Sequence, residues 1–501
     1  MAEKNNISEL ADLLSGVAVL SSSISEEILK GVEVNSLAAL VKAHFQSNAS
    51  GPNLLTPELI ADIMKNQSEK APEKIEVVRN GGFSPSAKDI DPNFRFRNAK
   101  LQTTAGTADS FVEYFRDRFH KLRAIMEKSR VFVSKLNSIE SLKQYTKGRE
   151  VSIIGIVCDR IVTKNGHILA TIEDETGQAK VLFLKSGTKE QQATFEAASR
   201  IIYDDVIAVK GKVSDPFVMA NSIMYPDTPI RDRKKTEEDF AIAFMSDIHV
   251  GSKKFLAKKF TAMLKWLNCD TDHNRELAGK IKYMVMSGDL VDGIGIYPNQ
   301  DRDLEVLDIY KQYSILFDYI REIPDYIHIF MLPGNHDAVH LAEPQPPLDS
   351  DLLRDFRQDN VHVLTNPAYM DIHGLKVLGY HGSSLDSIIR LVPNCSYAKP
   401  ETAMIETLKR RHLSPVYGGH MIIPAKSDSL VMDIVPDILH MGHIHKNAVA
   451  DYHGTLVVNS GTWQDRTDYQ VKQGHMPSPG VLPIYETKSA VTTNVDFNMM
   501  A

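Results

Sequence analysis

The chain has 501 residues, too many for one ordinary hydrophobic core, so two or three domains are expected. Its composition, 43% hydrophobic and 24% charged, is typical of a globular protein. The net charge of −7 excludes a general attraction to nucleic-acid phosphates, so a role on nucleic acid would depend on local patches or metal ions. Three widely separated cysteines, Cys158, Cys269 and Cys395, exclude paired-cysteine zinc motifs and fit a reducing cytoplasm. The chain starts with an acidic segment that lacks the apolar core of a signal peptide, and no apolar run reaches the ~18 residues of a membrane-spanning helix.

The first segments in chain order are helical and then polar. Residues 1–66 carry apolar residues at helical spacing, which predicts a small helical docking domain. Residues 67–108 are polar and rich in Gly, Pro, Lys and Ser, which predicts a flexible linker. Residues 109–147 form a helical segment, and one apolar face of its part 109–129 predicts packing on another element.

Residues 148–230 change to the two-residue period of strands. Three β-rich runs are followed by a helical stretch and further strands, an order that predicts an OB-fold barrel. Such barrels often bind single strands, but aromatic residues are scarce here. A strand-binding role and a purely structural role both remain open.

In residues 236–495, apolar strands alternate with helical stretches, which predicts a layered α/β domain. Five of these strands are each followed by side chains that commonly bind metals. These residues are Asp247 and His249; Asp289; Asn335, His336 and Asp337; His381; and His443 and His445. Because layered α/β sheets gather ligands at the carboxyl ends of their strands, we expect these side chains to meet at one site.

Aspartate, histidine and asparagine suit manganese, iron, zinc or magnesium, and manganese is our first expectation. The set is large enough for two divalent ions that share one carboxylate. Two such ions clamp a phosphate and lower the pKa of bound water to about 7. The residues therefore predict two-metal hydrolysis of a phosphate ester.

The motifs D-x-H, G-D, G-N-H-D, a single H and G-H-x-H, in that order, resemble the calcineurin-like metallophosphoesterases. "GDLVDGIG" and "GNHD" are closer to their nuclease and phosphodiesterase branch. With the barrel and the 109–129 helix, the chain resembles the small subunits of the archaeal family-D DNA polymerases. That resemblance implies a β-sandwich flanked by helices and a 3′–5′ exonuclease that proofreads single-stranded or mismatched 3′ ends of DNA for a large polymerising subunit. The related eukaryotic B-subunits have lost the metal ligands, whereas this chain has them all.

The resemblance also implies roles for the residues. One metal takes Asp247, His249 and His445; the other takes Asn335, His381 and His443; and Asp289 bridges the two. His336 stabilises the phosphate and protonates the leaving 3′ oxygen. Asp337 is expected to fix the tautomer of His336 from behind.

Other candidates carry weaker expectations. Lys253 and Lys254 follow the first ligand pair and are candidate DNA contacts, although a solvated helix face explains them better. His440 is expected on the strand and not at the metals, Trp463 in the core, and His420 has no role that the sequence reveals.

Two alternatives to a polymerase exonuclease subunit remain. One is a stand-alone repair nuclease or phosphodiesterase of the same superfamily. The other is a catalytically silent polymerase scaffold. The complete ligand set argues against the scaffold.

Overall fold

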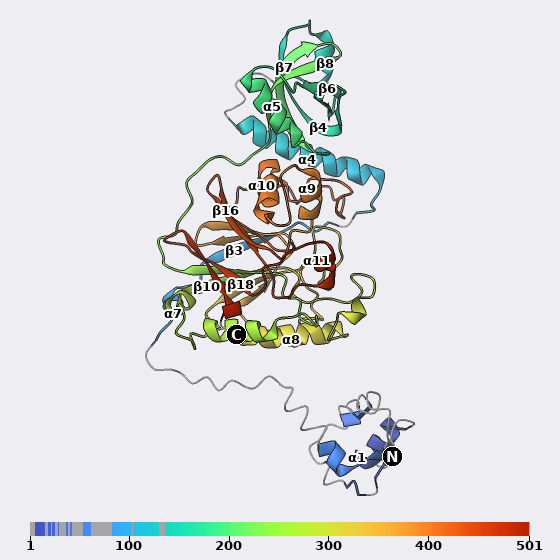
Figure 1. Cartoon of the computed structure of the whole chain (residues 1–501), viewed down its shortest axis with the longest axis vertical. Coiled ribbons are helices and arrows are strands. Elements are labelled where there is room, and N and C mark those ends of the chain that lie inside the picture. Colours follow the sequence, from blue (N-terminus) through green and yellow to red (C-terminus); the bar gives the residue numbers. More distant parts are fainter. Residues whose placement is uncertain are drawn as a thin grey trace. The chain divides into compact units, whose positions relative to one another are not determined.

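The computed structural model describes residues 83–102, 104–129 and 136–499, together with short stretches between residues 6 and 61. The chain divides into two units, residues 1–79 and residues 80–501, which are described separately (Figure 1). The first unit contains helix α1 (Asn6–Leu13) and two short parallel strands, β1 (Val19–Leu20) and β2 (Leu54–Leu55). Its buried residues include Leu10, Leu29 and Val41. The helical docking domain predicted over 1–66 is described only in part: residues 57–61 are helical, and residues 62–66 lie outside the described residues.

The second unit contains a closed five-stranded barrel. Its strands are β4 (Glu150–Val162), β5 (Ile168–Asp174), β6 (Gly177–Phe183), β7 (Val206–Ser214) and β8 (Phe217–Met224), in the order β4-β5-β6-β8-β7. Helix α5 (Lys189–Ser199) connects the third strand to the fourth and begins with a capping box at Thr188. The predicted order of three strands, a helix and further strands is confirmed, and the barrel is consistent with an OB-fold.

Helix α4 (Ala108–Lys128) lies between the barrel and the rest of the unit (Figure 1). Phe119, Leu122 and Met126 form a cluster with Ile154 and other barrel residues, so the predicted amphipathic helix packs mainly on the barrel. On the same helix, buried Arg118 donates to Asp428 (2.8 Å) and to the carbonyl of Pro415 (2.7 Å). The helix therefore ties the barrel to the following domain.

That domain consists of two six-stranded mixed sheets packed face to face, which agrees with a layered sandwich. The first sheet has the order β12-β11-β10-β9-β18-β19, with β9 (Ala241–Met245), β10 (Ile281–Ser287), β11 (His328–Leu332), β12 (Val361–Val363), β18 (Val481–Glu486) and β19 (Val491–Asp496). The second has the order β16-β17-β15-β14-β13-β3, with β3 (Phe94–Asn98), β13 (Ala368–Ile372), β14 (Leu375–Gly379), β15 (Ile438–Met441), β16 (Asn447–Tyr452) and β17 (Thr455–Ser460).

Helices cover the outer faces of the sandwich. α6 (Ala257–Leu267), α7 (Arg275–Gly279) and α8 (Ile309–Arg321) lie on the first sheet. α9 (Leu385–Leu391) and α10 (Pro400–Arg410) lie on the second, and α11 (Asp468–Lys472) follows β17. Short 3-10 helices span Ser86–Asp89, Glu140–Gln144, Gln300–Arg302 and Phe497–Met499.

The sheet interiors explain why the strands read as continuous apolar runs. Along β9, Ala241 and Ala243 face the core under the helices, whereas Ile242 and Phe244 face the core between the sheets. A strand buried on both faces needs apolar residues at every position. The strands predicted before the ligand residues are all present, as β9, β10, β11, β14 and β15.

The predicted linker over 67–108 is wrong for residues 83–102. β3 pairs antiparallel with β13 along its whole length, and Phe94 packs against the core between the sheets. Gly279 lies beside Phe83 and Pro85. The side chains of this edge strand are exposed except for Phe94, which is half-buried, so the strand needs few apolar residues and its polar composition does not reveal it.

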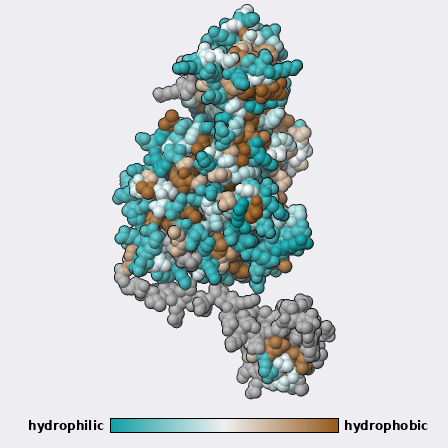
Figure 2. All heavy atoms as spheres, viewed as in Figure 1, coloured by the Kyte–Doolittle hydropathy of each residue, from teal (hydrophilic) through white to brown (hydrophobic). Residues whose placement is uncertain are grey.

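The visible surface of residues 80–501 is mostly hydrophilic, with hydrophobic residues in small scattered groups (Figure 2). None of the described helices has a long enough apolar stretch to cross a bilayer.

Candidate metal centre

The parallel strands of the two sheets carry the predicted ligands on the loops after their carboxyl ends. β9 leads to Asp247 and His249, β10 to Asp289, and β11 to Asn335, while β14 and β15 lead to His381 and to the pair His443 and His445. All seven side chains converge at this edge of the sandwich, as their contacts below show.

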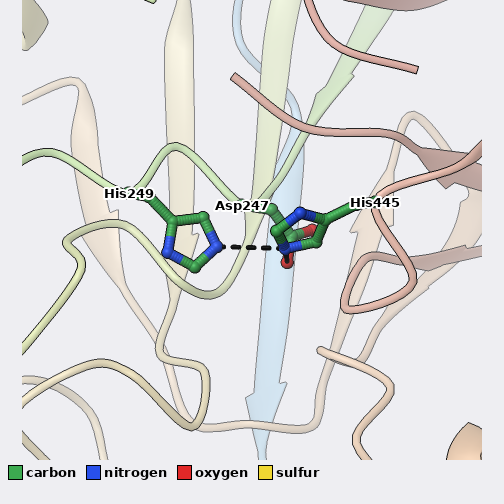
Figure 3. Close-up of side chains that lie close together, drawn as sticks. All are labelled: Asp247, His249 and His445. Carbon is green, nitrogen blue, oxygen red and sulfur yellow. Dashed lines mark hydrogen bonds and ion pairs between the residues drawn. The ribbon is translucent and has the colours of Figure 1, made fainter. Parts of the chain in front are cut away.

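Asp247, His249 and His445 form the first group (Figure 3). The Nε2 atoms of His249 and His445 lie 3.1 Å apart. His445 Nε2 also lies 3.3 Å from a carboxylate oxygen of Asp247. The three side chains are buried and come from two loops far apart in the sequence.

Asp289, His381 and His443 form the second group, and Asn335 joins it. His381 Nε2 lies 2.9 Å from Asn335 Oδ1 and 3.3 Å from Asp289 Oδ2. The same Asp289 oxygen lies 3.8 Å from His249 Nε2 in the first group. Asp289 therefore stands between the groups, where a bridging carboxylate would have to be.

The hydrogen bonds of three imidazoles leave each of them one nitrogen that can bind a cation. His249 Nδ1 donates to Asp292 (2.9 Å), His381 Nδ1 donates to the carbonyl of Ser287 (2.9 Å), and His443 Nε2 donates to Asp386 (3.1 Å). In each neutral ring the other nitrogen is then a lone-pair acceptor. Carboxylate and amide oxygens lie near the free nitrogens of His249 and His381, so the site gathers acceptors that a divalent ion would satisfy.

The close packing of carboxylates and imidazoles also shifts the pKa values of His381, His249 and Asp289. Burial lowers the pKa of His381, but the carboxylate of Asp289 outweighs burial and raises it to about 10. Burial likewise opposes the shift in His249, whose pKa the Asp292 carboxylate raises to about 8. Burial raises the pKa of Asp289, yet the imidazoles of His381 and His336 hold it well below the usual value. The centre thus attracts positive charge strongly.

Five of the seven predicted ligands have a left-handed backbone: Asp247, His249, Asp289, His443 and His445. This conformation is uncommon outside glycine and costs of order 1 kcal/mol per residue. Such strain persists only where surrounding contacts hold it, and it concentrates at functional sites.

At two positions in the motifs, a neighbouring carboxylate comes so close to the backbone that only glycine fits. A Cβ on Gly442 would overlap the Asp247 carboxylate, and one on Gly334 would overlap Asp289. The small residues before the ligands therefore leave room for the carboxylates to sit between the loops.

Sequence reasoning missed the residues that orient the ligands. Asp292 binds His249, Asp386 binds His443, and the Gln470 amide lies 2.9 Å from His445 Nδ1. Asp292 belongs to the "GDLVDGIG" motif and could have been found there. Asp386 and Gln470 stand in no motif, so their roles depend on tertiary contacts.

His336 lies beside the first group, with its ring 4.8 Å from that of His249. Its Nδ1 donates to the carbonyl of Asp292 (2.8 Å), and its backbone N–H donates to Asp289 (2.8 Å). Burial lowers the pKa of His336 and outweighs the nearby carboxylates.

The prediction that Asp337 fixes the His336 tautomer is wrong. The carbonyl of Asp292 does so, while the Asp337 carboxylate accepts from the backbone N–H of Gly334 (2.8 Å) and from Tyr313 (2.9 Å). The side chains of adjacent residues 336 and 337 point to different partners, which sequence adjacency cannot reveal. Burial raises the pKa of Asp337 to about 6.

The structure places the remaining candidates, His440, Trp463 and His420, in different surroundings. His440 lies on β15, buried, between the hydroxyls of Ser287 (2.9 Å) and Ser460 (3.0 Å), and burial lowers its pKa to about 3. Trp463 is buried in the core, as predicted. His420 Nε2 lies 3.4 Å from the buried carboxylate of Glu343.

The two candidate DNA contacts lie shortly before α6. Lys253 donates to the carbonyl of Arg302 (2.8 Å), and Lys253 and Lys254 are both exposed. Their contact with DNA stays a prediction.

A cavity of about 480 Å³ opens onto the centre. Its lining includes ligand residues, His336, and the aromatic side chains Tyr297, Tyr397, Tyr469 and His475. Residues of both ligand groups therefore line one cavity.

Known proteins resemble the chain over most of its length. The family described as the B-subunit of DNA polymerase alpha/epsilon matches residues 242–449. A DNA polymerase II small subunit from Methanocaldococcus jannaschii is 39% identical over 420 residues, covering 82% of this chain and 70% of that one. The one from Archaeoglobus fulgidus is 40% identical over 450 residues, covering 87% and 88%. Among solved structures, an archaeal phosphodiesterase matches 51% of this chain and 99% of its own at 14% identity, with a TM-score of 0.27.

Proposed function

The chain belongs to the family of the archaeal DNA polymerase II small subunits, and from this premise we propose that it is the 3′–5′ proofreading exonuclease of a two-subunit replicative polymerase. It hydrolyses phosphodiesters at single-stranded or mismatched 3′ ends of DNA. A large partner subunit carries out synthesis.

One observation carries the proposal: two groups of buried ligands converge with Asp289 between them. When bound, two divalent ions, with manganese as first choice, supply an activated water and neutralise the phosphate charge. A polymerase scaffold without chemistry would gain nothing from this arrangement, whose strained backbone costs stability.

The chain's own residues orient the ligands and move a proton. Asp292, Asp386 and the Ser287 carbonyl hold three imidazoles with a free nitrogen toward the ligand groups. His336 directs its remaining nitrogen, Nε2, away from the Asp292 carbonyl. Once protonated beside a bound phosphate anion, Nε2–H donates to the leaving 3′ oxygen.

The test is co-purification of the chain with a large partner, followed by digestion of matched and mismatched primers with manganese. We expect removal of 3′ nucleotides, faster from mismatched ends, and no digestion by the Asp289→Asn variant of the same complex. Leu307→Gln, an exposed change away from the centre, is the matched control.

Three other outcomes would contradict the proposal in different ways. Digestion by a chain that binds no large partner would favour a stand-alone nuclease. A stable complex without digestion would favour the silent scaffold. Digestion unaffected by Asp289→Asn would place the activity outside this centre.

A further inference from the structure

One part of the cavity wall is aromatic. Tyr297 and Tyr469 are 38% and 67% exposed, respectively, and both line the cavity. Isolated exposed tyrosines need no explanation, but these two belong to a cavity that already contains a candidate reactive centre.

The two rings reach the cavity from different elements. Tyr297 lies 6.4 Å from the His336 ring, and its hydroxyl donates to Asp303 (3.1 Å). Tyr469 is on α11, next to Gln470, whose amide contacts His445. Tyr297 therefore stands beside a side chain of the centre, and Tyr469 lines the same cavity.

A third aromatic group is already stacked. Tyr397 lies against His475 with ring centroids 4.1 Å apart and an interplanar angle of 28°. The Tyr397 hydroxyl donates to Asp386 (2.9 Å), which in turn holds His443. This pair is therefore a rigid part of the wall, whereas Tyr297 and Tyr469 keep exposed ring surface.

The charged residues of the cavity wall indicate which part of a nucleotide it can bind. Among the described residues that line the cavity there is no lysine or arginine, whereas aspartates 289, 292, 303, 386 and 468 are present. Beyond the metal ligands, a polyanion would meet several repulsive carboxylates along this lining. Arg390 and Arg466, which act on Asp386 and His475, are not themselves among the lining residues. For a nucleotide held outside the ligand groups, this lining therefore favours contacts with the base over contacts with the phosphate.

We propose that Tyr297 and Tyr469 stack on the bases at the 3′ end of a single DNA strand while the terminal phosphodiester lies at the ligand groups. Stacking on an aromatic ring tolerates every base, as proofreading requires. A paired terminal base must first leave its duplex neighbours, which costs least at a mismatch. The rings thus select unpaired ends. The inference rests on the proposed function, since it assumes that the centre acts on DNA.

The test compares two oligonucleotides that differ only at the 3′ end. One has ordinary bases throughout, and the other lacks the last two bases but keeps its phosphates. Phosphorothioate linkages at the 3′ ends slow hydrolysis, so binding of the full chain in manganese can be followed by fluorescence anisotropy. Hydrolysis is measured separately with ordinary phosphates.

We expect Tyr469→Ala and Tyr297→Ala each to weaken binding of the ordinary strand by about 5-fold to 150-fold, as loss of one base stack predicts. Binding of the strand with the abasic end should change by less than about 2-fold, because it offers no base to stack. Tyr469→Phe should recover most of what Tyr469→Ala loses, because it keeps the ring face. Tyr310→Ala, at a tyrosine on α8 outside the cavity that is about as exposed as Tyr469, is the matched control.

Equal losses on both strands, or no loss on either, would overturn the stacking proposal. If the wild-type chain binds the ordinary strand more tightly than the abasic one but hydrolyses neither, the stacking proposal stands and the exonuclease fails. If it hydrolyses both strands equally and the tyrosine variants bind normally, the exonuclease stands and the stacking proposal fails.

Discussion

At the residue scale, the role of each histidine is decided by the partner of its second nitrogen. His249, His381 and His443 each use one nitrogen on an acceptor and keep the other for the ligand groups. His440 uses both on serine hydroxyls and has none left. Three histidines within 440–445 are therefore not equivalent, although they are neighbours in the sequence.

The first prediction concerns His336. His336→Ala should reduce exonuclease turnover by about 100-fold or more, because general acid catalysis contributes about 100-fold to 10,000-fold. Metal content, measured by elemental analysis of the purified chain, should stay at the wild-type level. Loss of metal would mean that His336 is itself a ligand.

His440→Ala is the matched control, a buried histidine of the same region outside the ligand groups. It leaves a cavity and two serine hydroxyls without a partner, so we expect the free energy of unfolding to fall by about 2–4 kcal/mol. Turnover and metal content of the folded protein should remain near wild type.

At the scale of elements, the barrel joins the sandwich domain through a cluster of buried ions at the end of α10. Arg410 pairs with Asp205 of the barrel (2.7 Å), and Glu406 pairs with Arg200, next to the barrel helix, at 2.6 Å. Lys409 adds a third cation to Glu406 (3.0 Å). Because Glu406 is nearly inaccessible, its removal leaves cations without compensation.

The second prediction follows from this cluster. Glu406→Gln should lower the free energy of unfolding at pH 7 by about 2 kcal/mol or more, measured in urea. Glu401→Gln, on the first turn of the same helix, should change it by less than about 0.5 kcal/mol. Equal effects of the two changes would mean that the ion cluster does not hold the domains together.

The same cluster predicts a dependence on pH. Burial raises the pKa of Glu406, but Arg410, Lys409 and Arg200 outweigh it and lower the pKa from 4.5 to about 2. A lowered folded-state pKa stabilises the fold above pH 4.5, and this contribution disappears as the pH falls from about 4.5 to about 2. Over that range the wild type should lose more stability than Glu406→Gln, as urea unfolding at a series of pH values would show.

At the scale of the whole molecule, the ligand groups and the cavity belong to the sandwich domain, which shares residues 80–501 with the barrel. The barrel is fastened to this domain through α4 and α10. We propose that the ligand set serves hydrolysis, and the sequence contains no motif for nucleotide polymerisation that we could identify.

The third prediction is that the isolated chain cannot extend a primer. Incubated with a primed template, deoxynucleotides and manganese or magnesium, it should give no longer products on a sequencing gel. The complex with its large subunit should extend the same primer. Template-dependent extension by the pure chain would refute this division of labour.

Much of the site follows from the amino-acid sequence alone. Parallel strands buried on both faces are continuous apolar runs, and their carboxyl ends meet at one edge, so the residues after five such runs can be assigned to one centre. The barrel can likewise be predicted, because the two-residue period and the intervening helix are local features.

Tertiary contacts determine how these parts are completed. Asp386 and Gln470 orient ligands from helices that carry no motif, and surrounding loops impose the left-handed backbone of five ligands. Residues 94–98 become a strand only beside β13, and Asp337 turns to Gly334 and Tyr313 instead of His336. Each of these features depends on contacts between loops and strands that are far apart in the sequence. Such contacts produce no periodic pattern of residues, so the sequence alone does not reveal them.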